Sequence, residues 1–287
     1  MMTRMKYGIS LPQIGKLASA DAIRAVAQHA EKIGYDSLWV LERTLKPVKP
    51  VIPYPATKDG ELPEEYKIVF DPIESLTFAA AVTSRISLGT SVIVLSNHQP
   101  LSLARRLATL DQLSNGRLIC GFGVGWSKDE IEAAGVNFET RGRRASEFVR
   151  VLKAIWSDDP VEFHGDFFQI PKSYIGPKPV QRPHPPIILG GYVGKTFERV
   201  IEEGNGWNPA GVPPEHLPGM IEGLRSAARA KGKRPEDFSV YCRAFYYPTK
   251  EQFRELENMG VDHVILDASF NIASVDAALK RMEEIKP

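Results

Sequence analysis

Short apolar segments alternate along the chain with longer segments in which apolar residues recur every three or four positions. The short segments predict buried strands, and the long ones predict amphipathic helices. The first three are a strand over residues 6–11, a helix over 19–35 and a strand over 36–42. Ser19 is a suitable N-cap and Gly34 follows the helix, so the chain opens with a parallel strand pair joined by a crossover helix.

The same alternation continues to the end of the chain. Further strands are predicted, with helices between them, over residues 86–95, 116–123, 185–191, 206–210, 238–247 and 262–267. Eight strands in 287 residues fit a (β/α)₈ TIM barrel, which typically takes about 250 residues. A doubly wound parallel sheet is the alternative architecture. We expect a single domain over residues 1–287, with extended loops at the C-terminal mouth of the barrel.

Two long segments interrupt the alternation. Residues 43–70 carry five prolines without a helical or strand period, and residues 157–186 are also irregular. A loop this long in a compact domain usually has a function or is disordered. We expect residues 43–70, called the Pro-rich segment below, to act as a lid over a site at the end of the second strand. A surface insertion without a function is the alternative.

The amino-acid composition argues against several classes of function. Lys and Arg number 36 against 35 Asp and Glu, so charge gives no reason to expect binding to nucleic acid or an anionic membrane. No apolar run approaches the roughly 18 residues of a membrane span, and the first residues do not resemble a signal peptide. Cys120 and Cys242, the two cysteines, lie in apolar segments, which favours a reducing cytoplasm over a disulfide framework. The expected partner is a small-molecule substrate.

Two glycine-rich turns are candidate anion sites. In GFGVGW, residues 121–126, Trp126 occupies the place of the third glycine of a dinucleotide fingerprint, and no GK[ST] follows as a Walker loop requires. Gly125 permits close backbone approach before a helix N-terminus; the alternative interpretation is that Ser127 and Glu130 form only a capping box. Gly190 and Gly191 precede a helix that begins at Lys195, an arrangement typical of phosphate binding.

Barrel enzymes place their chemistry where the strands end at the C-terminal side. Glu42 closes the second strand and His98 lies just beyond the third, so both are candidate catalytic residues. The histidines and cysteines show no metal-ligand spacing, so no metal is expected. A barrel lyase or isomerase acting on a phosphorylated metabolite would need a lysine at a strand end, and none is found there.

Several of these segments together closely resemble the bacterial luciferase-like superfamily of flavin and deazaflavin enzymes. They are ISLGTSVIVL, PLSLARRLATLDQLSNGRLICGFGVGWSKDEIEAAGV, RGRRASEFVRVLKAIW, GPKPVQRPHPPIILGG and NGWNP, and the resemblance covers residues 6 to about 210. Within the superfamily the chain looks most like the branch that depends on coenzyme F420. The branch of FMN-dependent monooxygenases is the close alternative.

The resemblance implies a flavin-type ring at the C-terminal mouth, backed by a non-proline cis peptide at Ser91–Val92. It implies cofactor contacts at Leu11, Ser91, Val92, Gly125, Trp126, Asp129, Gly190 and Gly191, and a possible homodimer. Arg43 stands where relatives of the F420-using branch often carry a histidine, which leaves Glu42 and His98 as the candidates for proton transfer.

The resemblance also implies a reaction class. An F420-dependent enzyme would move a hydride between the deazaflavin and an organic substrate beneath the Pro-rich segment, whereas a bound FMN would make the chain a monooxygenase. A non-catalytic flavin-binding barrel is the second alternative, and it would lack a substrate cavity beside the ring.

Overall fold

The computed structural model describes residues 4–57, 59–192, 194–244, 248–267 and 272–285. Its central sheet is parallel and closed, because β3 pairs with β5 as well as with β2. The eight barrel strands are β1 (Lys6–Ser10), β2 (Ser37–Val40), β3 (Ser87–Thr90), β5 (Leu118–Gly123), β8 (Ile187–Gly190), β9 (Gly206–Asn208), β10 (Ser239–Arg243) and β11 (His263–Leu266). The predicted TIM barrel is confirmed, and the doubly wound alternative is wrong. Residues 245–247, the end of one predicted strand, lie outside the described residues.

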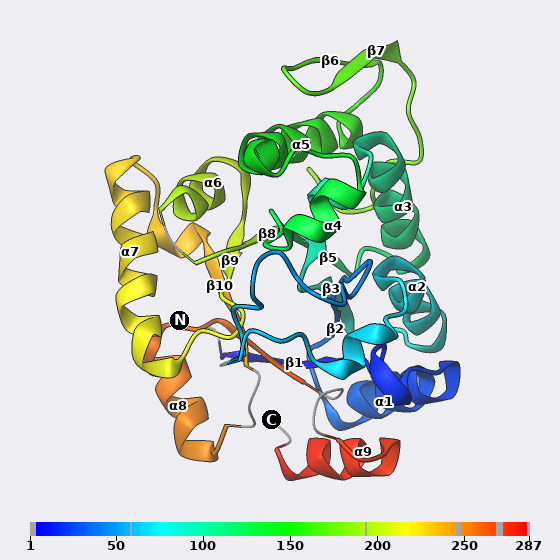
Figure 1. Cartoon of the computed structure of the whole chain (residues 1–287), viewed down its shortest axis with the longest axis vertical. Coiled ribbons are helices and arrows are strands. Elements are labelled where there is room, and N and C mark those ends of the chain that lie inside the picture. The colour runs from blue at the N-terminus through cyan, green and yellow to red at the C-terminus, as the bar shows by residue number, and fades with distance from the viewer. Residues whose placement is uncertain (1–3, 58, 193, 245–247, 268–271, 286–287) are drawn as a thin grey trace.

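Helices surround the barrel, as Figure 1 shows. The ring contains α1 (Ala20–Ile33), α2 (Pro72–Val82), α3 (Pro100–Leu113), α5 (Arg141–Trp156), α6 (Lys195–Glu203), α7 (Leu217–Ala230), α8 (Lys250–Met259) and α9 (Val275–Glu284). The short helix α4 (Lys128–Ala133) follows β5, and in the view of Figure 1 it lies inside this ring. Within the described residues, no helix has both the length and the apolar character needed to cross a membrane.

The termini of α1 follow the sequence prediction. The Ser19 hydroxyl accepts a hydrogen bond from the Ala22 backbone N–H at 3.1 Å, and Gly34 ends the helix with φ of 94°. Apolar residues at helical spacing bury one face of α1 against the barrel. Local capping and tertiary packing therefore specify the same element.

The third predicted strand, residues 86–95, is in fact two strands. Residues Ser91 and Val92 separate β3 from β4 (Ile93–Val94), which pairs with the end of β5. The Thr90 hydroxyl donates to the Gly121 carbonyl at 2.7 Å and accepts from the Gly121 N–H at 2.8 Å. A Cβ atom at position 121 would overlap the Thr90 carbonyl oxygen, so this close approach of β3 and β5 requires glycine.

Residues 157–186 are more regular than the sequence indicated. They contain an antiparallel hairpin of β6 (Val161–His164) and β7 (Gln169–Ser173), which projects beyond α5 in Figure 1. The Glu147 carboxylate of α5 accepts hydrogen bonds from the backbone N–H groups of residues 166, 167 and 168. The expectation of an irregular segment is therefore wrong for residues 161–173, because a buried carboxylate from another element fixes their turn.

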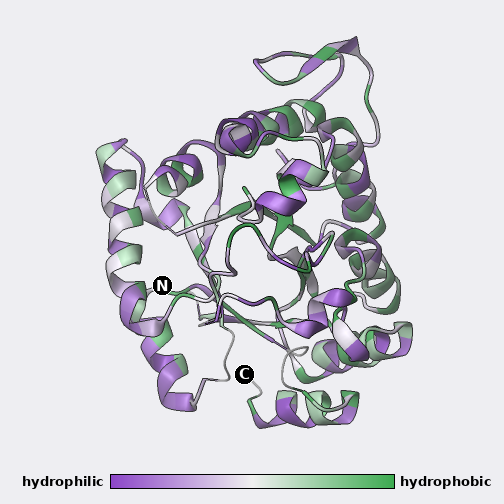
Figure 2. Cartoon of the chain, in the orientation of Figure 1, coloured by the Kyte–Doolittle hydropathy of each residue, from purple (hydrophilic) through white to green (hydrophobic). Residues whose placement is uncertain are grey.

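A buried polar network occupies the barrel interior beside Trp39. The Trp39 indole N–H donates to the Ser37 hydroxyl at 2.6 Å, and that hydroxyl shares a hydrogen bond with His263 Nε2 at 2.6 Å. The His263 ring also stacks on Tyr241, with 5.1 Å between ring centroids. Figure 2 shows that the helices around the barrel carry both hydrophobic and hydrophilic residues. Burial lowers the pKa of His263 to about 3, with a smaller contribution from Lys6.

The Gly121 contact predicts a large loss of stability in Gly121→Ala. The added methyl group displaces the Thr90 carbonyl, and overpacking typically costs about 1–3 kcal/mol in the free energy of unfolding. Urea denaturation measures the change. Gly142→Ala is the control, because a Cβ there lies 3.6 Å from its nearest neighbour, the Arg199 Nη2 atom. Equal stability of the two variants would contradict the assigned role of Gly121.

The His263 environment predicts a pH effect on stability. The unfolded chain binds a proton at this histidine below about pH 6.5, whereas the folded protein does so only near pH 3. His263 therefore removes about 1.4 kcal/mol of stability per pH unit as the pH falls from about 6 toward 4. His263→Gln is expected to lose this part of the slope, measured by denaturation at several pH values. The exposed histidine variant His216→Gln should keep the native slope.

Candidate functional site

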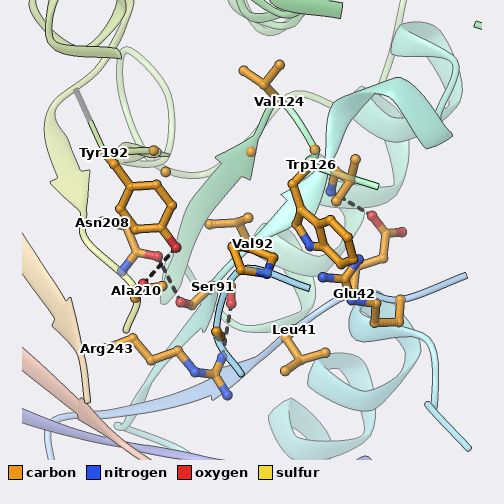
Figure 3. Close-up of a pocket in the computed structure, with 18 of the residues that line it drawn as sticks. Leu41, Glu42, Ser91, Val92, Val124, Trp126, Tyr192, Asn208, Ala210 and Arg243 are labelled. Carbon is orange, nitrogen blue, oxygen red and sulfur yellow. Dashed lines mark hydrogen bonds between the residues drawn. The ribbon is translucent and has the colours of Figure 1, made fainter. Parts of the chain in front are cut away.

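A cavity of about 290 Å³ lies at the C-terminal mouth of the barrel. Its walls come from the ends of β2, β4, β5, β8, β9 and β10 and from the Pro-rich segment. Figure 3 shows Tyr192 and Trp126 on opposite sides of Val92. Val94 and Val124 add further apolar surface. The cavity therefore occupies the position where barrel enzymes carry their chemistry.

The Ser91–Val92 peptide bond, which forms part of the cavity wall, is cis. This prediction is confirmed. The Ser91 hydroxyl donates to Asn208 Oδ1 at 2.8 Å, and the Asn208 amide donates to the Tyr241 carbonyl at 2.6 Å. The Arg243 guanidinium donates to the Ser91 carbonyl at 2.9 Å (Figure 3). Strands β9 and β10 thus hold the peptide in place.

Arg243 is a buried cation paired with a buried carboxylate. Its side chain is 2% exposed, and its Nη2 lies 2.8 Å from the Asp267 Oδ2 atom. A hydrogen bond between charged groups in a poorly solvated site holds both side chains in one geometry. The guanidinium, which also lines the cavity, is thereby directed at the Ser91 carbonyl.

The two predicted catalytic residues lie together. Glu42 lines the cavity, and its Oε1 lies 2.7 Å from His98 Nε2. Its Oε2 accepts a hydrogen bond from the Val94 N–H at 2.6 Å. Glu42 therefore joins the end of β2 to the backbone that follows the cis peptide. His98 is not among the cavity-lining residues and contacts the site through Glu42.

The helix after GFGVGW is capped differently from the sequence interpretation. The Ser127 hydroxyl accepts from the Glu130 N–H at 3.3 Å, as an N-cap does. The Glu130 carboxylate does not return to Ser127 as a capping box would require. It instead pairs with Arg43 Nη1 at 2.6 Å and accepts from the Thr44 N–H at 2.8 Å. Glu130 is 2% exposed and anchors the start of the Pro-rich segment.

The Pro-rich segment forms an aromatic wall of the cavity. Tyr54 and Tyr66 line the cavity together with Trp126, and the Tyr54 and Trp126 ring centroids are 5.2 Å apart. The two tyrosine hydroxyls lie 3.3 Å apart, and burial raises the pKa of Tyr66. Asp129 Oδ2 accepts from the Val51 N–H at 3.0 Å. Helix α4 therefore holds this segment at two points, Asp129 and Glu130.

The second glycine turn lies beside the same cavity. Gly190, Gly191 and Thr196 line it, and Gly191 has φ of 137°, a conformation that favours glycine. The Trp207 indole donates to the Gly191 carbonyl at 2.7 Å and fixes the turn. The exposed Lys195 is not among the lining residues. The turn and the start of α6 form a site suited to a phosphate group.

The structure brings most of the predicted site residues together. Seven of them line the cavity, namely Glu42, Ser91, Val92, Gly125, Trp126, Gly190 and Gly191. Leu11 is a buried core residue, and Asp129 contacts the Pro-rich segment, so their roles in cofactor binding stay predictions. The sequence interpretation missed Arg243 and Asn208. A charged residue inside the apolar segment FSVYCRAFYY was the signal for Arg243.

The lining residues fit a flavin-type cofactor. An apolar floor at Val92 suits a planar ring, and the glycine turn before α6 suits a phosphate at the other end. The Trp126 indole nitrogen is buried and donates no hydrogen bond within the described part of the chain. A buried donor without an acceptor is costly, so an occupant of this cavity, whether cofactor or substrate, is expected to supply one.

Curated relatives include proteins that use either cofactor. An uncharacterized protein of Mycobacterium tuberculosis is 36% identical over 212 residues, 72% of this chain and 75% of that protein. The F420-dependent glucose-6-phosphate dehydrogenase of Kineococcus radiotolerans is 33% identical, over 80% of this chain and 65% of that protein. The FMNH₂-dependent dimethylsulfone monooxygenase of Pseudomonas putida is 35% identical, over 46% of this chain and 38% of that protein.

A solved structure agrees with the fold. The monooxygenase RslO1 of Streptomyces bottropensis superposes with a TM-score of 0.78 and 22% identity, covering 97% of both chains. The model of the luciferase-like monooxygenase family matches residues 4–283. Together with the barrel and the cavity at its mouth, this match shows that the chain belongs to the luciferase-like monooxygenase family.

Proposed function

We propose that the chain is an F420-dependent oxidoreductase that acts on an organic substrate in the cavity at the barrel mouth. The observation that carries the proposal is a single cavity that combines an apolar wall at Val92 with a glycine turn and the start of a helix. An apolar platform with a phosphate-type site beside it is the combination that a deazaflavin nucleotide needs. When bound, F420 supplies two-electron hydride chemistry.

The choice of F420 over FMN is supported by the extent of the similarity. The F420-dependent dehydrogenase from Kineococcus aligns over 80% of this chain, whereas the FMNH₂-dependent monooxygenase from Pseudomonas aligns over 46%. Their identities, 33% and 35%, differ little. The wider alignment favours F420, and an FMN-dependent monooxygenase is the second candidate.

The chain's own residues would orient the ring and control the proton. Val92 would contact the ring face, because hydrogen bonds to the Ser91 hydroxyl and to the Ser91 carbonyl fix the backbone next to it. Glu42 Oε1 and His98 Nε2, which are 2.7 Å apart, would share a proton next to the cavity. Tyr54, Tyr66 and Trp126 would exclude water beneath the Pro-rich segment, so that segment would act as the lid.

Cofactor binding is the first test of the proposal. We expect the purified protein to bind F420 at micromolar concentration or tighter and to bind FMN at least tenfold more weakly, measured by fluorescence titration. Tight FMN binding without F420 binding would overturn the F420 assignment in favour of the monooxygenase. Binding of neither cofactor would contradict the oxidoreductase proposal itself.

Thr196→Val tests the site at the start of α6. The substitution keeps the side-chain shape and removes the hydroxyl that lines the cavity beside Gly191. We expect the F420 dissociation constant to rise about tenfold, the equivalent of about 1.4 kcal/mol for one hydrogen bond to a charged group. Thr109→Val, on the exposed face of α3, is the control. An unchanged affinity in Thr196→Val would place the phosphate elsewhere.

A further inference from the structure

Most polar side chains around the cavity already have partners within the protein. Both oxygens of Glu42 accept or share hydrogen bonds. Ser91 donates to Asn208, and the Tyr192 hydroxyl donates to the Ala210 carbonyl at 2.9 Å. A ligand therefore meets few available hydrogen-bonding groups here, and those that remain available determine which ligands fit.

Trp126 offers one such group. Its indole nitrogen is buried and has no hydrogen-bond acceptor among the described residues, although the side chain lines the cavity. Figure 3 shows the ring over the same side of the cavity as Glu42. An indole nitrogen donates and never accepts, so its missing partner is an acceptor atom.

Arg43 offers donors at the same place. Its guanidinium lies over the Trp126 ring, 4.7 Å from the centroid, and its side chain is 11% exposed. A guanidinium has five N–H donors, and the described residues take up only the Nη1 contact to Glu130. Glu130 fixes the group, since it also accepts from the Thr44 backbone. The remaining donors belong to a side chain that lines the cavity.

We propose that Arg43 and Trp126 form a carboxylate-binding subsite beneath the Pro-rich segment, and that the substrate carries a carboxylate. A planar guanidinium fork and a neighbouring indole N–H match the two oxygens of a carboxylate. The inference rests on the proposed function, because it assigns this end of the cavity to the substrate and the glycine turn at Gly190 to the cofactor.

The surroundings also define the rest of the substrate. Tyr54 and Tyr66 complete an aromatic wall around the Arg43 guanidinium, with ring centroids 5.9 and 5.5 Å from its carbon. Such walls favour a flat, apolar body next to the carboxylate. An aromatic or unsaturated carboxylic acid has this combination of features.

Benzoate and its neutral isostere benzamide test the subsite directly. The chain has four tryptophans, so a ¹⁵N-labelled sample gives four indole N–H signals, and the signal lost in Trp126→Phe identifies Trp126. We expect benzoate to shift this signal and to bind at least tenfold more tightly than benzamide. Equal affinity for the two probes, or a shift confined to other indole signals, would overturn the proposal.

Matched variants separate the two donors from general effects on folding. Arg43→Lys keeps the charge opposite Glu130 but loses the guanidinium fork, and Trp126→Phe keeps the ring but loses the N–H. Each is expected to weaken benzoate binding at least fivefold and to leave benzamide binding unchanged. Arg85→Lys, an exposed position, is the control. Equal loss for both probes would indicate a structural role and would overturn the assignment.

The same titration repeated with F420 present distinguishes failure of this inference from failure of the proposed function. Benzoate binding that persists beside bound F420 supports a separate substrate subsite. Competition between benzoate and F420 would assign Arg43 and Trp126 to the cofactor and overturn the inference alone. Arg43-dependent benzoate binding in a protein that does not bind F420 would overturn the proposed function while the carboxylate site stands.

Discussion

The site depends on how one short stretch of the third barrel strand is held. Between β3 and β4 the chain leaves the barrel ladder for two residues, and neighbouring strands supply the missing partners. Arg243 of β10 binds the Ser91 carbonyl, Asn208 of β9 binds the Ser91 hydroxyl, and Glu42 after β2 binds the Val94 N–H. Three distant parts of the sequence thus fix one backbone segment, and through it the cavity wall.

This arrangement explains the distribution of charge around the mouth. The buried ion pair Arg243–Asp267 and the partly buried pair Arg43–Glu130 would each be costly to break, because the remaining charge would be left without a partner. Arg243 donates to the Ser91 carbonyl, whereas Arg43 lines the cavity and packs over the Trp126 ring. The Asp267 and Glu130 carboxylates hold the two arginines in position.

The sequence predicted the barrel well, because strand and helix periods, caps and glycines at turns are local signals. The helix ends at Ser19 and Gly34 can each be recognised from a few adjacent residues, and so can the eight apolar segments that form the strands. The sequence predicted less well the features that depend on contacts between residues far apart in the chain. The hairpin at 161–173 needs Glu147, and the role of Glu130 depends on Arg43, which is 87 residues away in the sequence. Arg243 was missed because the local sequence does not distinguish an arginine buried inside the barrel from one at the edge of a strand. The cis peptide at Ser91–Val92 was predicted from the resemblance alone.

The attachment of the Pro-rich segment has a consequence for how such a protein diversifies. Helix α4 holds the Pro-rich segment largely through the main chain of that segment. The N–H groups of Thr44 and Val51 donate to the carboxylates of Glu130 and Asp129. Main-chain anchors survive most changes of side chain. Mutations can therefore change the side chains that face the ligand while the attachment of the segment stays the same. Substrate preference can then differ between related proteins that keep the same fold.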